Sequence, residues 1–452
     1  MSAVATSGPV LAASPGRPVD LLSQIGYGSG QVAGQVFRDL PSLLLLFFMT
    51  SVLGIPPGIA GAAIFVPKLL CGVVGDMLVG VLSDRWRARI PRRVWLLAGA
   101  AGAPLAMLLL FHVPALPMAG QVAWIIAAFT LYMLVFAVFS VPYLAIAGEM
   151  TDDPQQRTVL MAWRLVFSAI GILTAGALAP AIIDAGGGGQ AAYQNMAMVL
   201  AVICPAALVV AFFGARRGAG RSGLVEDPSL RLAISLREAL LLLSRPRFAV
   251  LAGAAMLQLT GAGMAYASLL YFLMYNMGRD DAFQLIGLVV FLACAGIVLA
   301  QPLWVAVSRR LGKIPTYVIA SLLYAGCYTA WSLSAGAPLW VIYVLVFAGA
   351  VGNSGWAMLG FSMLSDIAGE DRQHAGLYSA AWIAVDKIAF ALGGTLLVGL
   401  VLGAFGFDSA RAVAGLEQSS RALSGIVLSF GVLPGLLNVA GALLLWRHGR
   451  ER

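Results

Sequence analysis

The sequence predicts an all-helical membrane protein, and three observations support that prediction. Hydrophobic residues make up 60% of the 452 residues and charged residues only 11%, against about 25% charged residues in a typical soluble domain. The mean hydropathy is +0.91. The apolar residues also form repeated stretches of the length that a helix needs to cross a bilayer, which is about 20 residues.

Twelve such stretches are predicted, and short loops join most of them. They cover residues 21–52, 57–83, 93–113, 121–149, 158–184, 192–214, 247–277, 281–308, 313–334, 338–365, 374–404 and 422–447. The start of the chain lacks a basic segment followed by a long apolar core, so we expect no cleaved signal peptide.

The basic residues predict the orientation of these spans. Of the 28 Lys and Arg residues, three lie on one side of the predicted membrane, four lie inside spans, and the other 21 lie in the tails and on the opposite side. Basic loops remain in the cytoplasm, so both termini are expected there. The net charge of +8 therefore reflects topology, and nucleic acid is not an expected partner.

The one long loop divides the chain into two halves. We predict a cytoplasmic tail, a six-helix bundle, a basic cytoplasmic linker, a second six-helix bundle and a short cytoplasmic tail, over residues 1–20, 21–214, 215–246, 247–447 and 448–452. Within the linker, Leu230–Leu243 has the pattern of a helix that lies on the membrane surface.

The two halves share short motifs at matching places. The loop after the second span, which contains Ser83-Asp84-Arg85, has a weaker counterpart at residues 307–315. The acidic loop at residues 149–157 has its counterpart at residues 366–372. Two repeated halves joined by a long linker are typical of secondary transporters, whose binding site lies between the halves near the membrane midplane.

A series of short motifs runs along nearly the whole chain. They are, in order, Gly26-Tyr27-Gly28, Asp76 with Gly80 and Asp84, Val141-Pro142-Tyr143, Thr151-Asp152-Asp153 with Arg157 and Arg164, Pro302-Leu303-Trp304, Gly312-Lys313, residues 362–366, and Gly376-Leu377-Tyr378 with Lys387. Together these motifs resemble those of the major facilitator superfamily. More specifically, the chain is similar to the glycoside–pentoside–hexuronide:cation symporters, the family of the melibiose permease.

This resemblance implies twelve transmembrane helices in two pseudo-symmetric bundles, the major facilitator fold. It also implies transport of a sugar with a coupling cation by alternating access, with Asp76, Arg164 and Lys387 in the site. The chain departs from cation-coupled relatives at Gln35 and Gly72, where they carry acids, and at Ser140. A sodium site needs several negatively charged oxygen ligands, so these departures predict coupling to protons rather than to sodium.

Ionisable residues inside the membrane are candidates for ion coupling, because each costs at least ~2.5–3.5 kcal/mol there. We expect Asp76 to carry a proton or cation and Lys387 to pair with it. The alternatives are a structural ion pair for Asp76 and a lysine that reaches the interface. Lys68 could contact Asp76 or balance Asp39, and Asp39 could replace the acid missing at Gln35 or form a structural pair.

Arg164 and several aromatic residues are the candidates for substrate binding. A guanidinium offers several donors in a fixed fork, suited to hydroxyls or a carboxylate. Trp163, Tyr27, Tyr143 and Trp382 could stack on a sugar ring or simply pack against other helices. Charged residues at the cytoplasmic helix ends are expected to act as a gate or helix clamp, namely Asp84, Arg85, Arg92, Arg93 and Arg157.

The sequence therefore predicts a secondary active transporter of the bacterial inner membrane that moves a sugar or glycoside with a proton or another cation. An amphiphile such as a lysolipid is the alternative solute, and a membrane-embedded lipid-modifying enzyme is the alternative class. The three histidines and four cysteines are scattered, without CxxC pairs, so no catalytic cluster, metal or cofactor is expected. We expect a monomer whose partners are the solute, the cation and the lipid bilayer.

Overall fold

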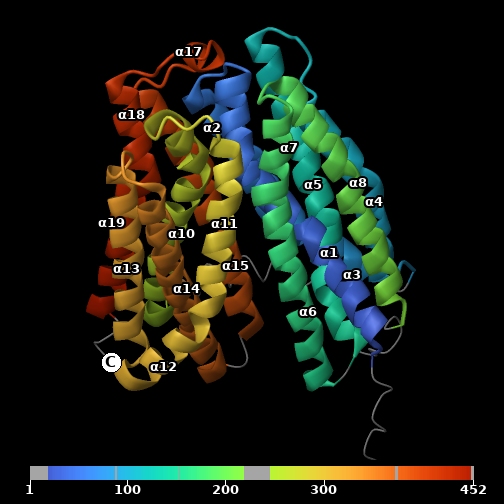
Figure 1. The fold of residues 1–452 in the computed structure, drawn as a ribbon. Coiled ribbons are helices and arrows are strands. Elements are labelled where there is room, and N and C mark those ends of the chain that lie inside the picture. The colour runs from blue at the N-terminus through green and yellow to red at the C-terminus, as the bar shows by residue number, and fades with distance from the viewer. Residues whose placement is uncertain (1–18, 87–88, 152, 218–244, 372–374, 449–452) are drawn as a thin grey trace, which may run out of the picture.

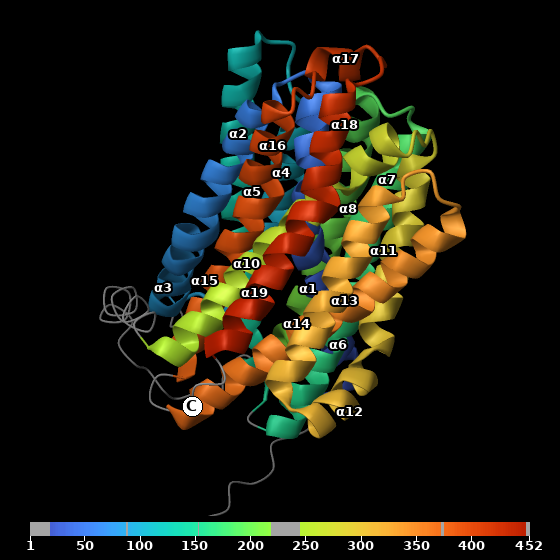
Figure 2. The same cartoon turned by 90° about the vertical axis from the view of Figure 1, so that its left-hand side faces the viewer.

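A computed structural model describes residues 19–86, 89–151, 153–217, 245–371 and 375–448. The predicted surface helix at residues 230–243 and most of both predicted tails lie outside these residues. Over the described ranges the chain is helical, and long helices lie side by side in two groups (Figures 1 and 2). We call the end at which α1 begins and α19 ends the lower end, as in Figure 1, and the opposite end the upper end.

The first half of the chain forms six membrane-length helices, several of which contain a π-helical turn. In chain order the segments are α1 Leu21–Leu40, η1 Pro41–Leu45 and η2 Phe48–Val52; α2 Pro57–Leu69, η3 Leu70–Gly75 and α3 Asp76–Arg85; α4 Arg92–Phe111; α5 Met118–Met150; α6 Pro154–Leu173, η4 Thr174–Leu178 and α7 Ala179–Ala185; and α8 Gln190–Gly214 with η5 Ala215–Arg217.

The second half repeats this plan. Its segments are α10 Pro246–Tyr271 and η7 Phe272–Asn276; α11 Ala282–Leu299 and α12 Gln301–Leu311; α13 Lys313–Leu333; α14 Leu339–Glu370; α15 Ala375–Ala391, η9 Leu392–Leu397 and α16 Val398–Ala404; and α18 Ser420–Val427, η10 Leu428–Val432 and α19 Leu433–His448. A short helix, α17 Ser409–Val413, lies in the last upper loop.

These helices match the predicted spans, and the main differences are at their ends. For example, α14 continues to Glu370, five residues past the predicted end, through residues that are less apolar than the stretch before them. Similarly, α6 begins after Asp153, whose carboxylate accepts a hydrogen bond from the backbone N–H of Gln155 at 2.9 Å. Hydropathy therefore locates the part of each helix inside the bilayer and misses its capped ends.

Ten of the helices in the described ranges are long and apolar enough to cross a membrane. The predicted spans 21–52 and 313–334 are not among the ten, although the structure places a long helix at each. Both helices carry polar side chains within the stretch that would cross the membrane. Several of these side chains, such as Gln35 and Ser321, are buried inside the protein. Large apolar side chains such as Leu165 and Val202 are exposed on the outside, as expected for a surface that faces lipid.

The two halves are joined mainly in the middle and at the upper end. Here α2 packs on η9 and α16, α10 packs on η1, and α11 packs on η4 and α7. At the lower end, the described ion pairs join helices of the same half, such as Arg92 to Glu149 and Lys313 to Asp366. The two groups of helices also diverge toward the lower end in Figure 1. The structure is thus the conformation in which the halves meet at the upper end.

Candidate functional site

A polar stripe on α1 forms the centre of the candidate site. Gln31, Gln35 and Arg38 are spaced four and three residues apart, so they lie on one face of the helix. Two residues of α6, also four apart, contact this stripe. The Nε of Arg164 donates to the side-chain oxygen of Gln31, and the hydroxyl of Ser168 donates to that of Gln35, both at 3.0 Å.

Gln35 connects this stripe to a buried acid. Its side-chain amide nitrogen donates to a carboxylate oxygen of Asp39 at 2.7 Å, and Asp39 is only 8% exposed. The glutamine thus occupies the place of the missing acid and hydrogen-bonds another acid one turn away. Gln31 and Ser168 were not predicted as site residues, because neutral polar side chains carry little energetic signal in a sequence.

Arg164 is the predicted substrate residue that carries a charge. Besides Gln31, its guanidinium contacts the sulfur of Met161 at 3.5 Å and lies 5.5 Å from the ring centre of Tyr143. It also hydrogen-bonds to the side chain of Tyr27. These described contacts are with uncharged groups, so the guanidinium keeps a positive charge that a solute's oxygens could use.

Helix α15 brings two opposite charges from the second half to the first. Asp386 lies 3.6 Å from Arg38 of α1, and the next residue, Lys387, forms an ion pair with Asp76 of α3. The Lys387 ammonium also donates to the backbone carbonyl of Gly72 at 3.2 Å. The structure thus brings together the predicted pair Asp76 and Lys387, and it adds the Arg38–Asp386 pair, whose partners sequence reasoning did not match.

Lys68 points toward α1 rather than toward Asp76. Its ammonium donates to the Ser42 hydroxyl at 2.9 Å. Both Lys68 and Arg38 also lie within 6 Å of the centre of the Phe390 ring, at 5.6 and 5.9 Å, in cation–π range. Of the two predicted arrangements, the geometry favours the one in which Lys68 faces the Asp39 side of the site.

The charged side chains of the site are partly exposed. The side chain of Arg38 is 49% exposed, and those of Asp76 and Lys387 are 21% and 31% exposed. These residues lie within the membrane-spanning helices, away from the ends of the protein.

Three of the four predicted stacking residues are buried in this conformation. The rings of Tyr27 and Tyr143 stack on each other at 4.8 Å, and the Tyr143 hydroxyl donates to the Tyr27 carbonyl at 2.8 Å. Trp382 is 6% exposed and packs against Phe361. Trp163 is only partly buried. Contact of these rings with a solute stays a prediction, and the first three would need to become exposed.

The contacts described for the predicted gate residues lie within the first half. Arg92 of α4 forms ion pairs with Asp84 of α3 and, at 2.6 Å, with Glu149 of α5. Arg93 donates to the Arg216 carbonyl at 3.2 Å, and Arg157 donates to the Thr151 carbonyl at 3.0 Å. Arg85 ends α3 and is exposed. Their role as a gate between the halves stays a prediction.

The upper end carries a seal that sequence reasoning missed. The hydroxyls of Thr50 and Tyr271 are hydrogen-bonded at 2.6 Å, and Tyr275 donates to Ser51 at 3.1 Å. The ring of Phe47 also packs against Tyr271 at 5.0 Å. All of these contacts join one half to the other. In sequence, each of these residues looks like an ordinary member of an apolar run.

Comparisons with known proteins identify the family of the chain. A family model described as MFS/sugar transport protein matches residues 26–449. The inner membrane symporter YicJ of Escherichia coli K12 is 26% identical over 436 residues, which cover 94% of this chain and 91% of YicJ. The putative glycoside/cation symporter YagG of the same organism is 27% identical over 423 residues, which cover 92% and 88% of the two chains.

A solved structure shares the fold. A bacterial homologue of the human lysosomal transporter Spinster, in an inward-facing and unoccupied conformation, superposes with a TM-score of 0.71 at 15% identity, covering 95% of this chain and 96% of that one. Because the family model spans both halves and the charged cluster between them, this chain belongs to the MFS/sugar transport protein family of the major facilitator superfamily and is a multi-pass membrane transporter, not an enzyme.

Proposed function

We propose that this transporter moves a small hydroxylated solute, with sugars and glycosides as the first candidates, together with a proton across the bacterial inner membrane. It acts as a monomer with both termini in the cytoplasm. The observation that carries the proposal is the ion pair between Asp76 of one half and Lys387 of the other, beside the polar stripe of α1.

Protonation of Asp76 is the proposed coupling step. A proton on this carboxylate removes the negative partner of Lys387 and weakens a contact that joins the two halves. The two conformations of the transporter then differ in stability by an amount that depends on the proton, and this dependence is what coupling requires. The nearby Arg38–Asp386 pair keeps α15 attached to α1 during this step.

The surroundings of Asp76 favour a proton over sodium. One turn before it, Gly72 supplies only a backbone carbonyl, and that carbonyl already accepts a hydrogen bond from Lys387. The ammonium of Lys387 thus already occupies the oxygen atoms of Gly72 and Asp76 that would have to bind a metal cation. Na⁺ prefers several hard oxygen ligands, and a site with one carboxylate that is already paired to a lysine is poor in them.

The polar stripe favours a solute with several hydroxyl groups. From Gln31 to Arg38 the stripe rises about 10 Å along α1, at about 1.5 Å per residue. It offers amide, hydroxyl and guanidinium groups rather than a continuous apolar surface. These groups suit a sugar better than the acyl chain of a lysolipid.

The charges of the interior further favour an acidic sugar. Four cations, Arg38, Lys68, Arg164 and Lys387, lie mid-way along the spanning helices with only three carboxylates, Asp39, Asp76 and Asp386. One positive charge therefore remains in a region where uncompensated charge is costly. A carboxylate or sulfonate on the solute would balance it, and a proton on Asp76 would strengthen the attraction.

Flux measurements in proteoliposomes test the proposal. We expect a panel of sugars, glycosides and sugar acids to contain a solute that drives proton entry, and we expect imposed pH gradients, but not sodium gradients, to drive its uptake. Asp76→Asn should abolish uphill uptake while downhill exchange persists. Asp281→Asn, in an exposed upper loop, is the matched control. Uphill uptake by Asp76→Asn with an unchanged pH profile would refute the coupling role, and transport of lysolipids without proton flux would favour an amphiphile carrier.

A further inference from the structure

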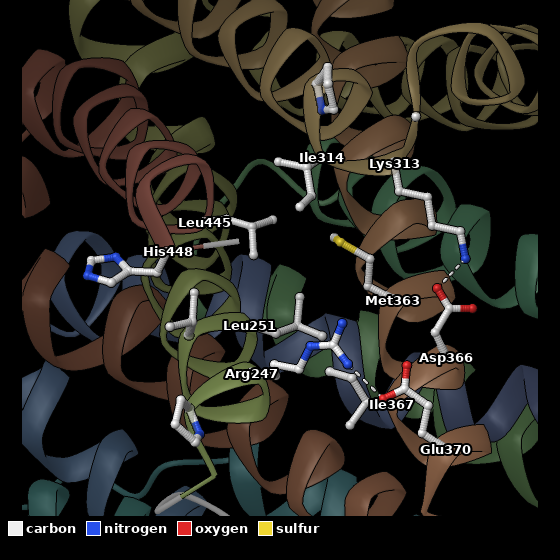
Figure 3. A pocket seen from close by; sticks show the side chains of 14 residues that line it. Arg247, Leu251, Lys313, Ile314, Met363, Asp366, Ile367, Glu370, Leu445 and His448 are labelled. Carbon is white, nitrogen blue, oxygen red and sulfur yellow. Dashed lines mark hydrogen bonds and ion pairs between the residues drawn. The ribbon is translucent and has the colours of Figure 1, made fainter. Parts of the chain in front are cut away.

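A pocket of about 510 Å³ lies at the lower end of the second half, away from the polar stripe. It is lined by α10, α13, α14 and α19 (Figure 3). Its apolar wall includes Leu251 and Leu445, both buried, with Ile314 and Met363 beside them. The transport mechanism proposed above does not use this pocket.

Two ion pairs form the polar side of the pocket. Arg247 of α10 lies 2.7 Å from Glu370 of α14, and Lys313 at the start of α13 pairs with Asp366 of α14. Figure 3 shows both pairs next to the apolar side chains, with His448 at the far side. Each of the four paired side chains is more than a third exposed. Both signs of charge are therefore accessible to a ligand.

The pocket lies at the depth of the lipid headgroups. The helices that line it begin or end there, since α10 begins at Pro246, α13 begins at Lys313, α14 ends at Glu370 and α19 ends at His448. Charged pockets between transmembrane helices at this depth can bind lipid headgroups. The apolar wall would contact the glycerol and the first carbons of the acyl chains.

We propose that this pocket binds the headgroup of a phospholipid that carries both a phosphate and a primary ammonium, as phosphatidylethanolamine does. The phosphate contacts Arg247 and Lys313, and the ammonium contacts Asp366 and Glu370. Arginine and lysine both retain further N–H donors when one is used by a carboxylate, so the existing ion pairs remain as the phosphate binds.

The balance of charges selects this class of lipid. Apart from His448, the pocket has two cations and two carboxylates. An anionic headgroup would bring a net negative charge toward the two carboxylates, whereas a zwitterionic headgroup matches both signs. A choline headgroup has the same charges as ethanolamine but has no N–H to donate to the carboxylates. Ethanolamine should therefore bind better than choline.

The test compares lipids that differ only in the headgroup. The full-length protein is placed in nanodiscs of phosphatidylcholine, with or without a fraction of phosphatidylethanolamine or phosphatidylglycerol of the same acyl chains. Thermal unfolding and native mass spectrometry then report stability and bound lipid. We expect phosphatidylethanolamine to raise Tm by several degrees and to be retained several-fold more often than either other lipid.

Charge-neutral double variants locate the effect. Arg247→Gln with Glu370→Gln should remove the preference while keeping the net charge, and Lys313→Gln with Asp366→Asn is a second, independent pair. Arg279→Gln with Asp281→Asn is the control, because it removes an exposed ion pair of 2.5 Å at the upper end. There Arg279 hydrogen-bonds to Asp281 and lowers the pKa of that carboxyl, so the control also removes a genuine charge interaction.

Three outcomes would overturn the proposal. The first is equal retention of phosphatidylethanolamine and phosphatidylcholine by the unmodified protein. The second is a preference that persists in both double variants. The third is an equal rise in Tm with inorganic phosphate in pure phosphatidylcholine, which would identify a soluble phosphate as the ligand. The comparison in the unmodified protein remains informative even if a variant fails to fold.

Discussion

The two halves approach each other closely at a pair of glycines, and this contact predicts how to shift the transporter between its conformations. Gly61 of α2 faces Gly399 of α16 near the upper end. A Cβ placed on Gly399 would lie 2.4 Å from the carbonyl oxygen of Pro57 and 3.1 Å from the Cα of Gly61. Both neighbours are backbone atoms, so no side chain can rotate away, and Gly399→Ala should disfavour the conformation seen here.

The magnitude follows from the overlap. Ordinary contact begins near 3.4 Å, so the two helices would have to separate by roughly 1 Å at Gly399 to admit the methyl group. Overpacking of this kind costs about 1–3 kcal/mol. Opening the upper end relieves the clash, so the equilibrium should shift toward the upper-open conformation by roughly 5- to 150-fold.

Distances between spin labels measure this shift. In a background without the native cysteines, labels at Met118 and Val413, both about half exposed, report on the upper end. Labels at Gln155 and Ser365, both exposed, report on the lower end. Gly399→Ala should lengthen the upper distance and shorten the lower one in a larger fraction of molecules.

A neighbouring glycine supplies the control. A Cβ on Gly403, one turn further along α16, would be 3.7 Å from the nearest atom, which is an ordinary contact. Gly403→Ala should therefore leave both distance distributions unchanged. If Gly399→Ala behaves like Gly403→Ala, the glycine contact does not limit the upper-closed conformation and the reasoning is wrong.

Three further predictions concern the charged cluster and the upper seal. Arg38→Gln and Asp386→Asn should each slow transport, and the double variant should lose less than the sum of the two, as a mutant cycle on initial uptake rates would show. Tyr271→Phe removes the hydroxyl that bonds Thr50 across the halves; at about 0.5–1.5 kcal/mol per hydrogen bond, the upper-open fraction should rise by roughly 2- to 12-fold in the spin-label assay. Arg164→Gln should reduce the preference for sugar acids over the matching neutral sugars in competition assays, and an unchanged preference would place the acid elsewhere.

The sequence predicted the spans well because the cost of exposing polar groups to lipid leaves a strong pattern. It also identified the interior charges one by one, including Asp76 and Lys387, since each is costly in a membrane. Pairing was harder to predict. Nothing local shows that Asp386 faces Arg38, because the two lie more than 340 residues apart and meet only through the packing of α15 on the first half.

Uncharged site residues were not identified for a different reason. Gln31 and Ser168 are tolerated in many helices, and their role emerges only when α6 is placed beside α1. Thr50 and Tyr271 likewise form a contact between the halves only once the bundle is assembled. The predicted rings of Tyr27 and Tyr143 show the converse, since aromatic composition alone does not distinguish a stacked internal pair from a surface that a solute can reach.

The adjacent opposite charges of α15 also fix how this helix is seated. If α15 slipped by one residue in one direction, Lys387 would approach Arg38, and a slip in the other direction would bring Asp386 toward Asp76. Either slip would replace an attraction with a repulsion. The adjacent Asp386 and Lys387 therefore favour a single register of α15 against the first half, and the same register should be restored each time the halves separate and rejoin.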